Sequence, residues 1–117
     1  MNLELDKRVA ELKGWVNENK IVIGSKPKWI DEFGFLNEEV PNFSSNINYA
    51  WPLFEDLGKA QIYHDPSAFG ENKFCCTVFE LPSFKQIAFS GVSAQEAICK
   101  AWVFLKEIES KYLYANN

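Results

Sequence analysis

The chain has 117 residues and a formal net charge of -4, with 47% hydrophobic, 24% charged and 15% aromatic residues. This composition is typical of a globular protein and excludes a disordered tail or a fibre. The length accommodates one domain, so we expect residues 1–117 to form a single domain. Twelve Lys and Arg against sixteen Asp and Glu disfavour nucleic-acid binding, because a protein that follows a duplex neutralises several phosphates with a basic face.

The sequence carries no sign of export or membrane insertion. Its first residues alternate charged and apolar side chains and lack the apolar stretch of a signal peptide. The longest nearly apolar run, residues 97–105, is interrupted by Lys100 and is shorter than the about 20 residues of a membrane-spanning helix. Cys75, Cys76 and Cys99 cannot all pair within one chain. We therefore expect reduced thiols in an intracellular compartment and no membrane contact.

The first predicted element is a helix over residues 3–13, which places three apolar side chains on one stripe and is followed by Gly14 as a C-terminal cap. The β-branched run of residues 21–23 predicts a strand. Residues 24–46 are rich in turn formers and in aromatic side chains, and they predict a packed hairpin or an ordered loop.

A second helix is predicted after Ser44 or Ser45, either of which can cap its N-terminus, and it ends before Gly58. Apolar residues recur within it at spacings of three and four. Pro52 lies well beyond the first turn and removes a backbone donor, so we expect the helix to kink or to restart near Trp51.

From residue 59 the apolar period changes to two, which predicts an antiparallel meander over residues 60–64, 73–80 and 85–90. Both faces of its middle strand are largely apolar, which indicates a sheet covered on both sides. A long helix follows, with a capping box from Ser93 to Glu96 and a wide apolar stripe. The predicted fold is therefore α+β, with a central antiparallel sheet of about four strands and about three helices in a layered sandwich.

Three segments, in order along the chain, together resemble a known family. They are residues 5–11 with Gly14 and Trp15, residues 41–47 leading to Ala50, Trp51 and Leu57, and residues 93–101 closing on Leu105. The pattern is similar to that of the phage ABA sandwich domain, a small domain encoded by bacteriophages and prophages. The resemblance implies helices packed on a central sheet and a viral origin. Together with the intracellular compartment expected above, it makes the host cytoplasm the predicted location. It implies no catalytic residues, because the family has no established activity. The sequence departs from the pattern at Pro52 and in residues 29–43.

Catalytic chemistry has only one candidate pair. His64, the only histidine, could act as a general base if Cys75 lay within reach, which requires residue 62 to pair with residue 75. A loop histidine and a small core thiol are the more common interpretation, so we predict no catalytic residue and no enzyme activity.

Metal binding is also not indicated. The cysteines and the histidine do not have zinc-ligand spacing. The acidic pairs at residues 31–32, 38–39 and 55–56 lack the spaced oxygen ligands of a calcium loop and are interpreted as solvated surface. We predict neither a metal site nor a cofactor.

A small anion-binding corner is one hypothesis. Lys20, Lys26 and Lys28 could hold a charged group while Trp29 stacks on a base. The more common interpretation is a lysine-rich turn beside a core tryptophan. The hypothesis corresponds to a protein that sequesters a nucleotide-like ligand.

The aromatic surplus supports a different hypothesis. Trp29, Phe33, Phe35 and Phe43 lie among acidic residues and could form a protein interface with an apolar centre and a charged rim, or could simply seal the sheet. The preferred function is a non-enzymatic accessory protein that binds a host or phage protein or associates with itself, and an inhibitor of bacterial defence fits its size and acidity. An RNA-binding or antitoxin-like module is a further alternative, because such proteins also contain a meander followed by a capped helix.

Overall fold

The computed structural model describes residues 2–18, 28–66, 70–81 and 84–115. These ranges contain three helices and two antiparallel sheets of three strands each. The helices are α1 (Leu3–Leu12), α2 (Ile47–Asp56) and α3 (Ala94–Ala115). The first sheet consists of β1 (Val16–Glu18), β2 (Lys28–Ile30) and β3 (Leu36–Asn37), and the second of β4 (Ala60–His64), β5 (Phe74–Leu81) and β6 (Phe84–Gly91).

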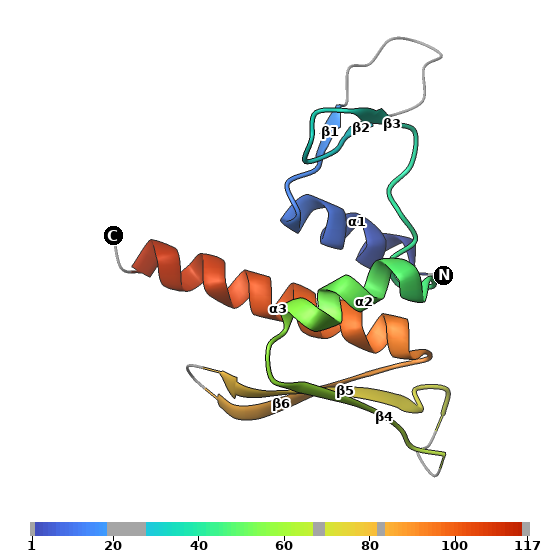
Figure 1. The fold of residues 1–117 in the computed structure, drawn as a ribbon, viewed down its shortest axis with the longest axis vertical. Coiled ribbons are helices and arrows are strands. Elements are labelled where there is room, and N and C mark those ends of the chain that lie inside the picture. The colour runs from blue at the N-terminus through green and yellow to red at the C-terminus, as the bar shows by residue number, and fades with distance from the viewer. Residues whose placement is uncertain (1, 19–27, 67–69, 82–83, 116–117) are drawn as a thin grey trace.

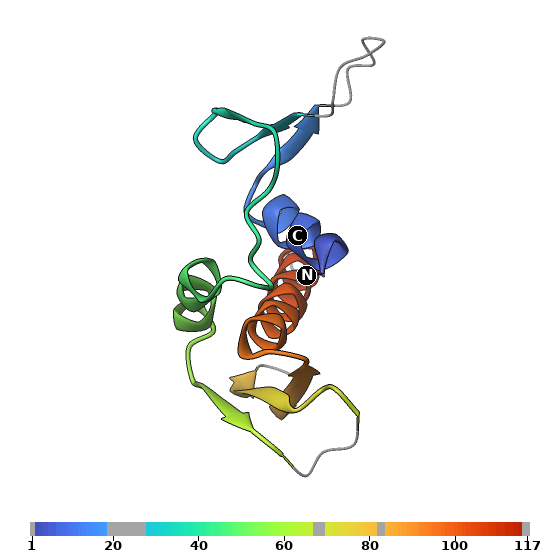
Figure 2. The ribbon, with the colours of Figure 1, turned by 90° about the vertical axis from the view of Figure 1, so that its right-hand side faces the viewer.

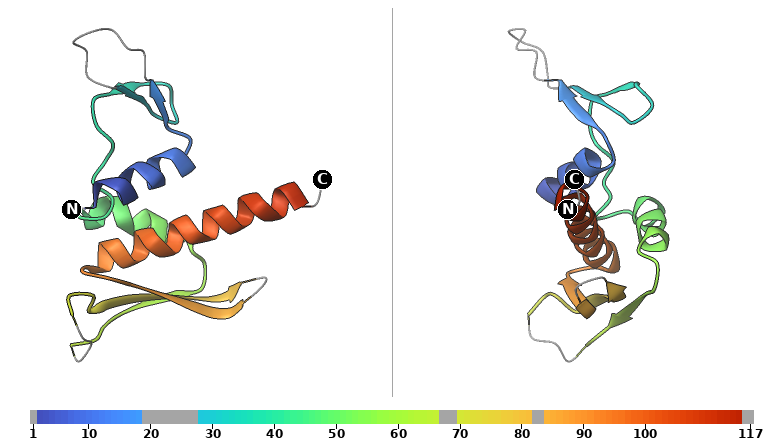
Figure 3. Two further views of the ribbon diagram at one scale, coloured as in Figure 1. Left: turned by 180° about the vertical axis from the view of Figure 1, so that it is seen from behind. Right: turned by 90° about the vertical axis from the view of Figure 1, so that its left-hand side faces the viewer.

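The helices lie between the two sheets (Figure 1). Helix α3 runs along one face of the second sheet, while α1 and α2 pack on α3. The side view in Figure 2 and the views in Figure 3 show the same succession of second sheet, helices and first sheet. The fold is α+β as predicted, but the strands form two sheets of three and not one sheet of about four. The helix layer separates the short strands near the N-terminus from the meander.

Helix α1 is held to the rest of the chain by a stripe that includes a buried acid. Val9 and Ala10 belong to the core, and Asp6 on the same stripe is only 1% exposed. The Asp6 carboxylate accepts a 2.7 Å hydrogen bond from the backbone N–H of Ser44, and the Ser44 hydroxyl accepts one from the backbone N–H of Asn2. A buried carboxylate needs such donors, so this network fixes the start of α1 against the segment before α2.

Helix α2 is capped by Asn46, one residue after the later of its two predicted caps. The side-chain oxygen of Asn46 accepts the backbone N–H of Asn48 and caps the helix. The predicted cap at Ser44 or Ser45 is wrong, because Ser44 is buried in the network with α1. The helix continues through Pro52 without a restart. Because Pro52 has no backbone N–H, the carbonyl of Asn48 lacks its helical donor. Asn48 is an exposed residue.

The second sheet is covered by α3 on one face. Cys76 and Val78 of β5 are buried there, and Ile62 of β4 and Phe89 of β6 pack beside them. The opposite face carries Tyr63, which is exposed, together with the other alternating side chains of the three strands. None of the described elements covers that face, so the prediction of a sheet covered on both sides is wrong for this part of the chain.

The elements with strong local signals are confirmed. The meander strands appear within a residue or two of their predicted bounds, and Ser93 caps α3 by accepting the backbone N–H of Glu96 at 3.1 Å. Gly14 follows α1 with a φ of 98°, as its predicted capping role requires. The strand predicted at residues 21–23 lies outside the described residues.

Candidate functional site

The outer face of the first sheet presents a row of apolar side chains. The antiparallel register places Val16, Ile30 and Leu36 directly opposite one another on three adjacent strands. Val16 and Leu36 are each 60% exposed, and Ile30 is partly buried. We call these three residues the apolar row. Apolar side chains aligned in this way form a continuous strip of surface on one side of the sheet.

The turn between β2 and β3 exposes two further aromatic rings. Phe33 is 78% exposed and Phe35 is 68% exposed. One carboxylate oxygen of Asp31 accepts the backbone N–H groups of both phenylalanines at 2.9 Å, and its other oxygen accepts the side-chain amide of Asn37 at 3.0 Å. Gly34, with a φ of 87°, supplies the left-handed conformation that closes the turn. We call residues 31–35 the phenylalanine turn.

The phenylalanine turn is held by charge-assisted hydrogen bonds. Desolvation raises the pKa of Asp31, but the donors from Phe35, Asn37 and Phe33 outweigh it and lower that pKa below its ordinary value. The turn is also fixed to the core, because the indole N–H of the buried Trp15 donates to a carboxylate oxygen of Glu32 at 3.3 Å. Because the backbone of the turn is already ordered, binding through the two rings does not have to order it.

The structure divides the four aromatic residues that the sequence proposed as an interface. Phe33 and Phe35 lie on the surface. Trp29 and Phe43 are only 5% and 3% exposed and belong to the core, so they do not lie on the surface beside Phe33 and Phe35. Trp29 is buried because the alternation of β2 points it to the inner face of the first sheet.

The proposed anion corner is not assembled by the described residues. Lys28 is exposed and precedes Trp29 in β2, so their side chains lie on opposite faces of the first sheet. Lys20 and Lys26 lie outside the described residues.

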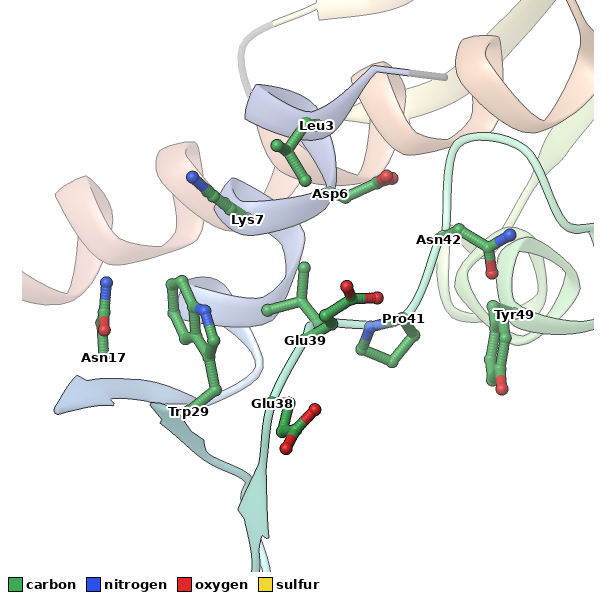
Figure 4. Close-up of a pocket in the computed structure, with 11 residues that line it drawn as sticks. Leu3, Asp6, Lys7, Asn17, Trp29, Glu38, Glu39, Pro41, Asn42 and Tyr49 are labelled. Atoms are coloured by element: carbon green, nitrogen blue, oxygen red, sulfur yellow. The ribbon is translucent and has the colours of Figure 1, made fainter. Parts of the chain in front are cut away.

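A groove of about 670 Å³ lies between α1, the inner face of the first sheet and the segment of residues 38–42 (Figure 4). Trp29 and Tyr49 contribute aromatic rings to it, and Asp6, Glu38 and Glu39 contribute carboxylates. The remaining lining residues are Leu3, Lys7, Asn17, Val40, Pro41 and Asn42.

The pair considered for catalysis is not formed. His64 pairs with Phe74 across the strands, and Tyr63, not residue 62, pairs with Cys75. His64 and Cys75 therefore point to opposite faces of the second sheet, and the His64 ring lies 4.7 Å from that of Phe74. Among the described residues, three or more potential metal ligands do not come together anywhere. In the same ranges, each helix is too short or too polar to cross a bilayer.

Several residues of these surfaces were missed by reasoning from the sequence. Val16 and Leu36 give no local signal, because their strands have only three and two residues and their alignment depends on register. Glu38 and Glu39 were interpreted as ordinary solvated surface. Their position beside Pro41 and ahead of the second helix gives no sign that α1 forms the opposite wall of a groove.

Comparisons with known proteins agree with the fold. The sequence is similar to the Phage ABA sandwich domain family, whose model matches residues 8–103. The structure is similar to the 2.0 Å crystal structure of a phage protein from Bacillus cereus ATCC 14579, with 20% sequence identity and a TM-score of 0.63, over 89% of this chain and 86% of that chain. No curated protein matches. The family match spans most of the chain, and the chain belongs to the Phage ABA sandwich domain family.

Proposed function

We propose that this phage domain is a non-enzymatic accessory protein that binds a host or phage protein through the apolar row and the phenylalanine turn. The observation that carries the proposal is the exposure of Val16, Leu36, Phe33 and Phe35 on one small sheet. Isolated apolar residues are common on protein surfaces, but an aligned strip next to exposed aromatic rings is typical of an interaction site.

The arrangement has the composition of an interface. Its centre is apolar and aromatic, and Asp31 and Glu32 of the phenylalanine turn provide carboxylates beside the two rings. Phenylalanine is enriched in interface centres, where a few large side chains contribute most of the binding free energy. The hydrogen bonds of Asp31 hold the backbone of Phe33 and Phe35 before binding, which reduces the backbone part of the entropic cost of association.

An inhibitor of a bacterial defence protein is the form of this function that the charge supports best. The net charge of -4 favours association with a basic surface, and such surfaces are common on host proteins that bind nucleic acid. The test is whether expression of the domain restores plating of a phage that the host's defence system restricts.

The two alternatives receive less support. Sequestration of a nucleotide-like ligand needs cations beside Trp29, but the groove next to this residue carries three carboxylates and one lysine. An RNA-binding or antitoxin-like module needs a basic face, and the excess of acidic residues opposes one. Salt-dependent RNA binding would separate that function from protein binding.

The proposal is tested by capture of a partner from host lysate with immobilised variants. Replacement of Phe33 and Leu36 together by serine should weaken binding of the captured protein at least about thirtyfold, because each residue lies at the centre of the proposed interface. Val92→Ser is the matched control, since Val92 is 48% exposed and lies between β6 and α3, outside the first sheet. The proposal is contradicted if the double variant captures the partner as well as the wild type does. It is also contradicted if the wild type captures no partner.

A further inference from the structure

We infer that the groove between α1 and residues 38–42 binds a basic peptide segment that carries arginine or lysine. This inference deepens the proposed function, because it names the chemistry of a second contact with the partner. The groove lies against the inner face of the first sheet, whose outer face carries the apolar row. One partner could therefore contact both sides of this sheet.

The walls of the groove suit a long side chain with a charged end. Trp29 and Val40 supply apolar lining. Tyr49, which lies across the groove from Trp29 in Figure 4, supplies a ring that is 45% exposed. The volume of about 670 Å³ is within the range of ligand sites and is sufficient for a short peptide segment. The apolar stem of arginine or lysine can pack on such walls while its charged end stays near polar groups.

The charge of the groove selects a cation. Glu38 and Glu39 present two exposed carboxylates, against one ammonium group on Lys7, while the third acid of the lining, Asp6, is buried and bonded to Ser44. In Figure 4 Glu38 and Glu39 lie beside Pro41, whereas the ammonium group of Lys7 points away from them. An anionic ligand would meet repulsion here, and a cationic segment is attracted.

Glu38 and Glu39 are available for this role. Neither carboxylate has a hydrogen bond or an ion pair with another described residue, in contrast to Asp6, which is bonded to Ser44. Their position on consecutive residues gives an extended partner two acceptors at one site. The planar guanidinium of arginine can pair with a carboxylate through two hydrogen bonds and stack on an aromatic ring. Arginine is therefore the favoured side chain.

The inference is tested by titrating the ¹⁵N-labelled protein with the peptide acetyl-Gly-Arg-Arg-Gly-amide. We expect amide shifts at Lys7 and Asn17, and at Glu38, Glu39, Val40 and Asn42, which flank or precede the amide-free Pro41. The peptide with citrulline in place of arginine keeps a planar side chain of similar shape, but it removes the charge and replaces one NH₂ donor group by a carbonyl oxygen, so it should bind at least about tenfold more weakly. Binding of the arginine peptide should also weaken as salt rises.

Two double variants separate the site from a general charge effect. Replacement of Glu38 and Glu39 by glutamine should reduce arginine-peptide affinity about tenfold. The same replacement at Glu55 and Glu71, which are exposed and do not line the groove, should change it less than twofold. Equal binding of both peptides, equal effects of both double variants, or shifts outside the groove overturn the inference. Because this assay contains no partner protein, its failure would leave the capture experiment above unaffected.

Discussion

The carboxylate of Asp6 and the backbone N–H of Ser44 form a 2.7 Å hydrogen bond between positions 38 residues apart in the chain. Both residues are almost completely buried. The bond holds α1 to the segment that continues from the groove into α2, and Asp6 itself lines the groove. The wall of the groove and the packing of α1 therefore depend on one buried acid.

Replacement of Asp6 by alanine should lower the free energy of unfolding by about 1.5–3 kcal/mol, because it leaves the buried N–H of Ser44 without its charged acceptor. Urea unfolding measures the change. Glu4→Ala is the control, because Glu4 occupies the same first turn of α1 but is exposed. A loss for Asp6→Ala no larger than that for Glu4→Ala would show that the hydrogen bond does not stabilise the fold.

The three cysteines should differ sharply in reactivity. Burial raises the pKa of Cys76 and that of Cys99 to about 12, and both thiols lie in the core. Cys75 is partly exposed on the face of the second sheet that α3 does not cover. At neutral pH we expect iodoacetamide to modify one cysteine in the native protein and three after denaturation, as measured by intact mass. Protection of Cys75 as well would indicate that another molecule covers this face.

The pair formed by Asp56 and Trp102 predicts a pH-dependent contribution to stability. The indole N–H of Trp102 donates to Asp56 at 2.9 Å, and the ammonium of Lys106 lies 3.0 Å from the same oxygen. The Trp102 hydrogen bond, followed by that from Lys106, lowers the pKa of Asp56 below its ordinary value of 3.8. The contribution of ionised Asp56 to the free energy of unfolding is therefore complete above the pKa that Asp56 has in the unfolded state. It is lost as pH falls through the lower pKa of the folded state.

The wild type should lose stability as pH falls from about 5 to about 2, and Asp56→Asn should lose less. The difference in the free energy of unfolding should be less than about 1 kcal/mol, because the carboxylate is half exposed. Urea unfolding at a series of pH values measures this difference. Glu55→Gln, on the neighbouring exposed residue, should leave the pH profile unchanged. Parallel profiles for the wild type and Asp56→Asn would contradict the assigned role of Asp56.

Local signals were sufficient to predict the long elements of the fold. The capping box at Ser93 and the apolar stripe predicted α3, and alternation predicted β4, β5 and β6. These signals depend on neighbouring residues, so the sequence contains them directly. The division into two sheets depends on contacts across the helix layer. The alternation of apolar and polar residues within one strand does not predict such contacts.

The candidate site was only partly predictable for the same reason. Phe33 and Phe35 were identified from their residue type and their acidic neighbours. The burial of Trp29 follows from the direction of β2, and the apolar row follows from the register of three very short strands. Asp6 did offer a missed signal, because it lies three and four residues before Val9 and Ala10 and so shares their buried stripe.

The most direct test of the central claim is site-specific photocrosslinking in phage-infected host cells. Benzoyl-phenylalanine at position 33 replaces an exposed ring of the phenylalanine turn, and the same residue at position 79 places the probe on the open face of the second sheet. The account predicts one discrete protein crosslinked from position 33 and none from position 79. Crosslinking from position 79 alone, or from neither position, would contradict it.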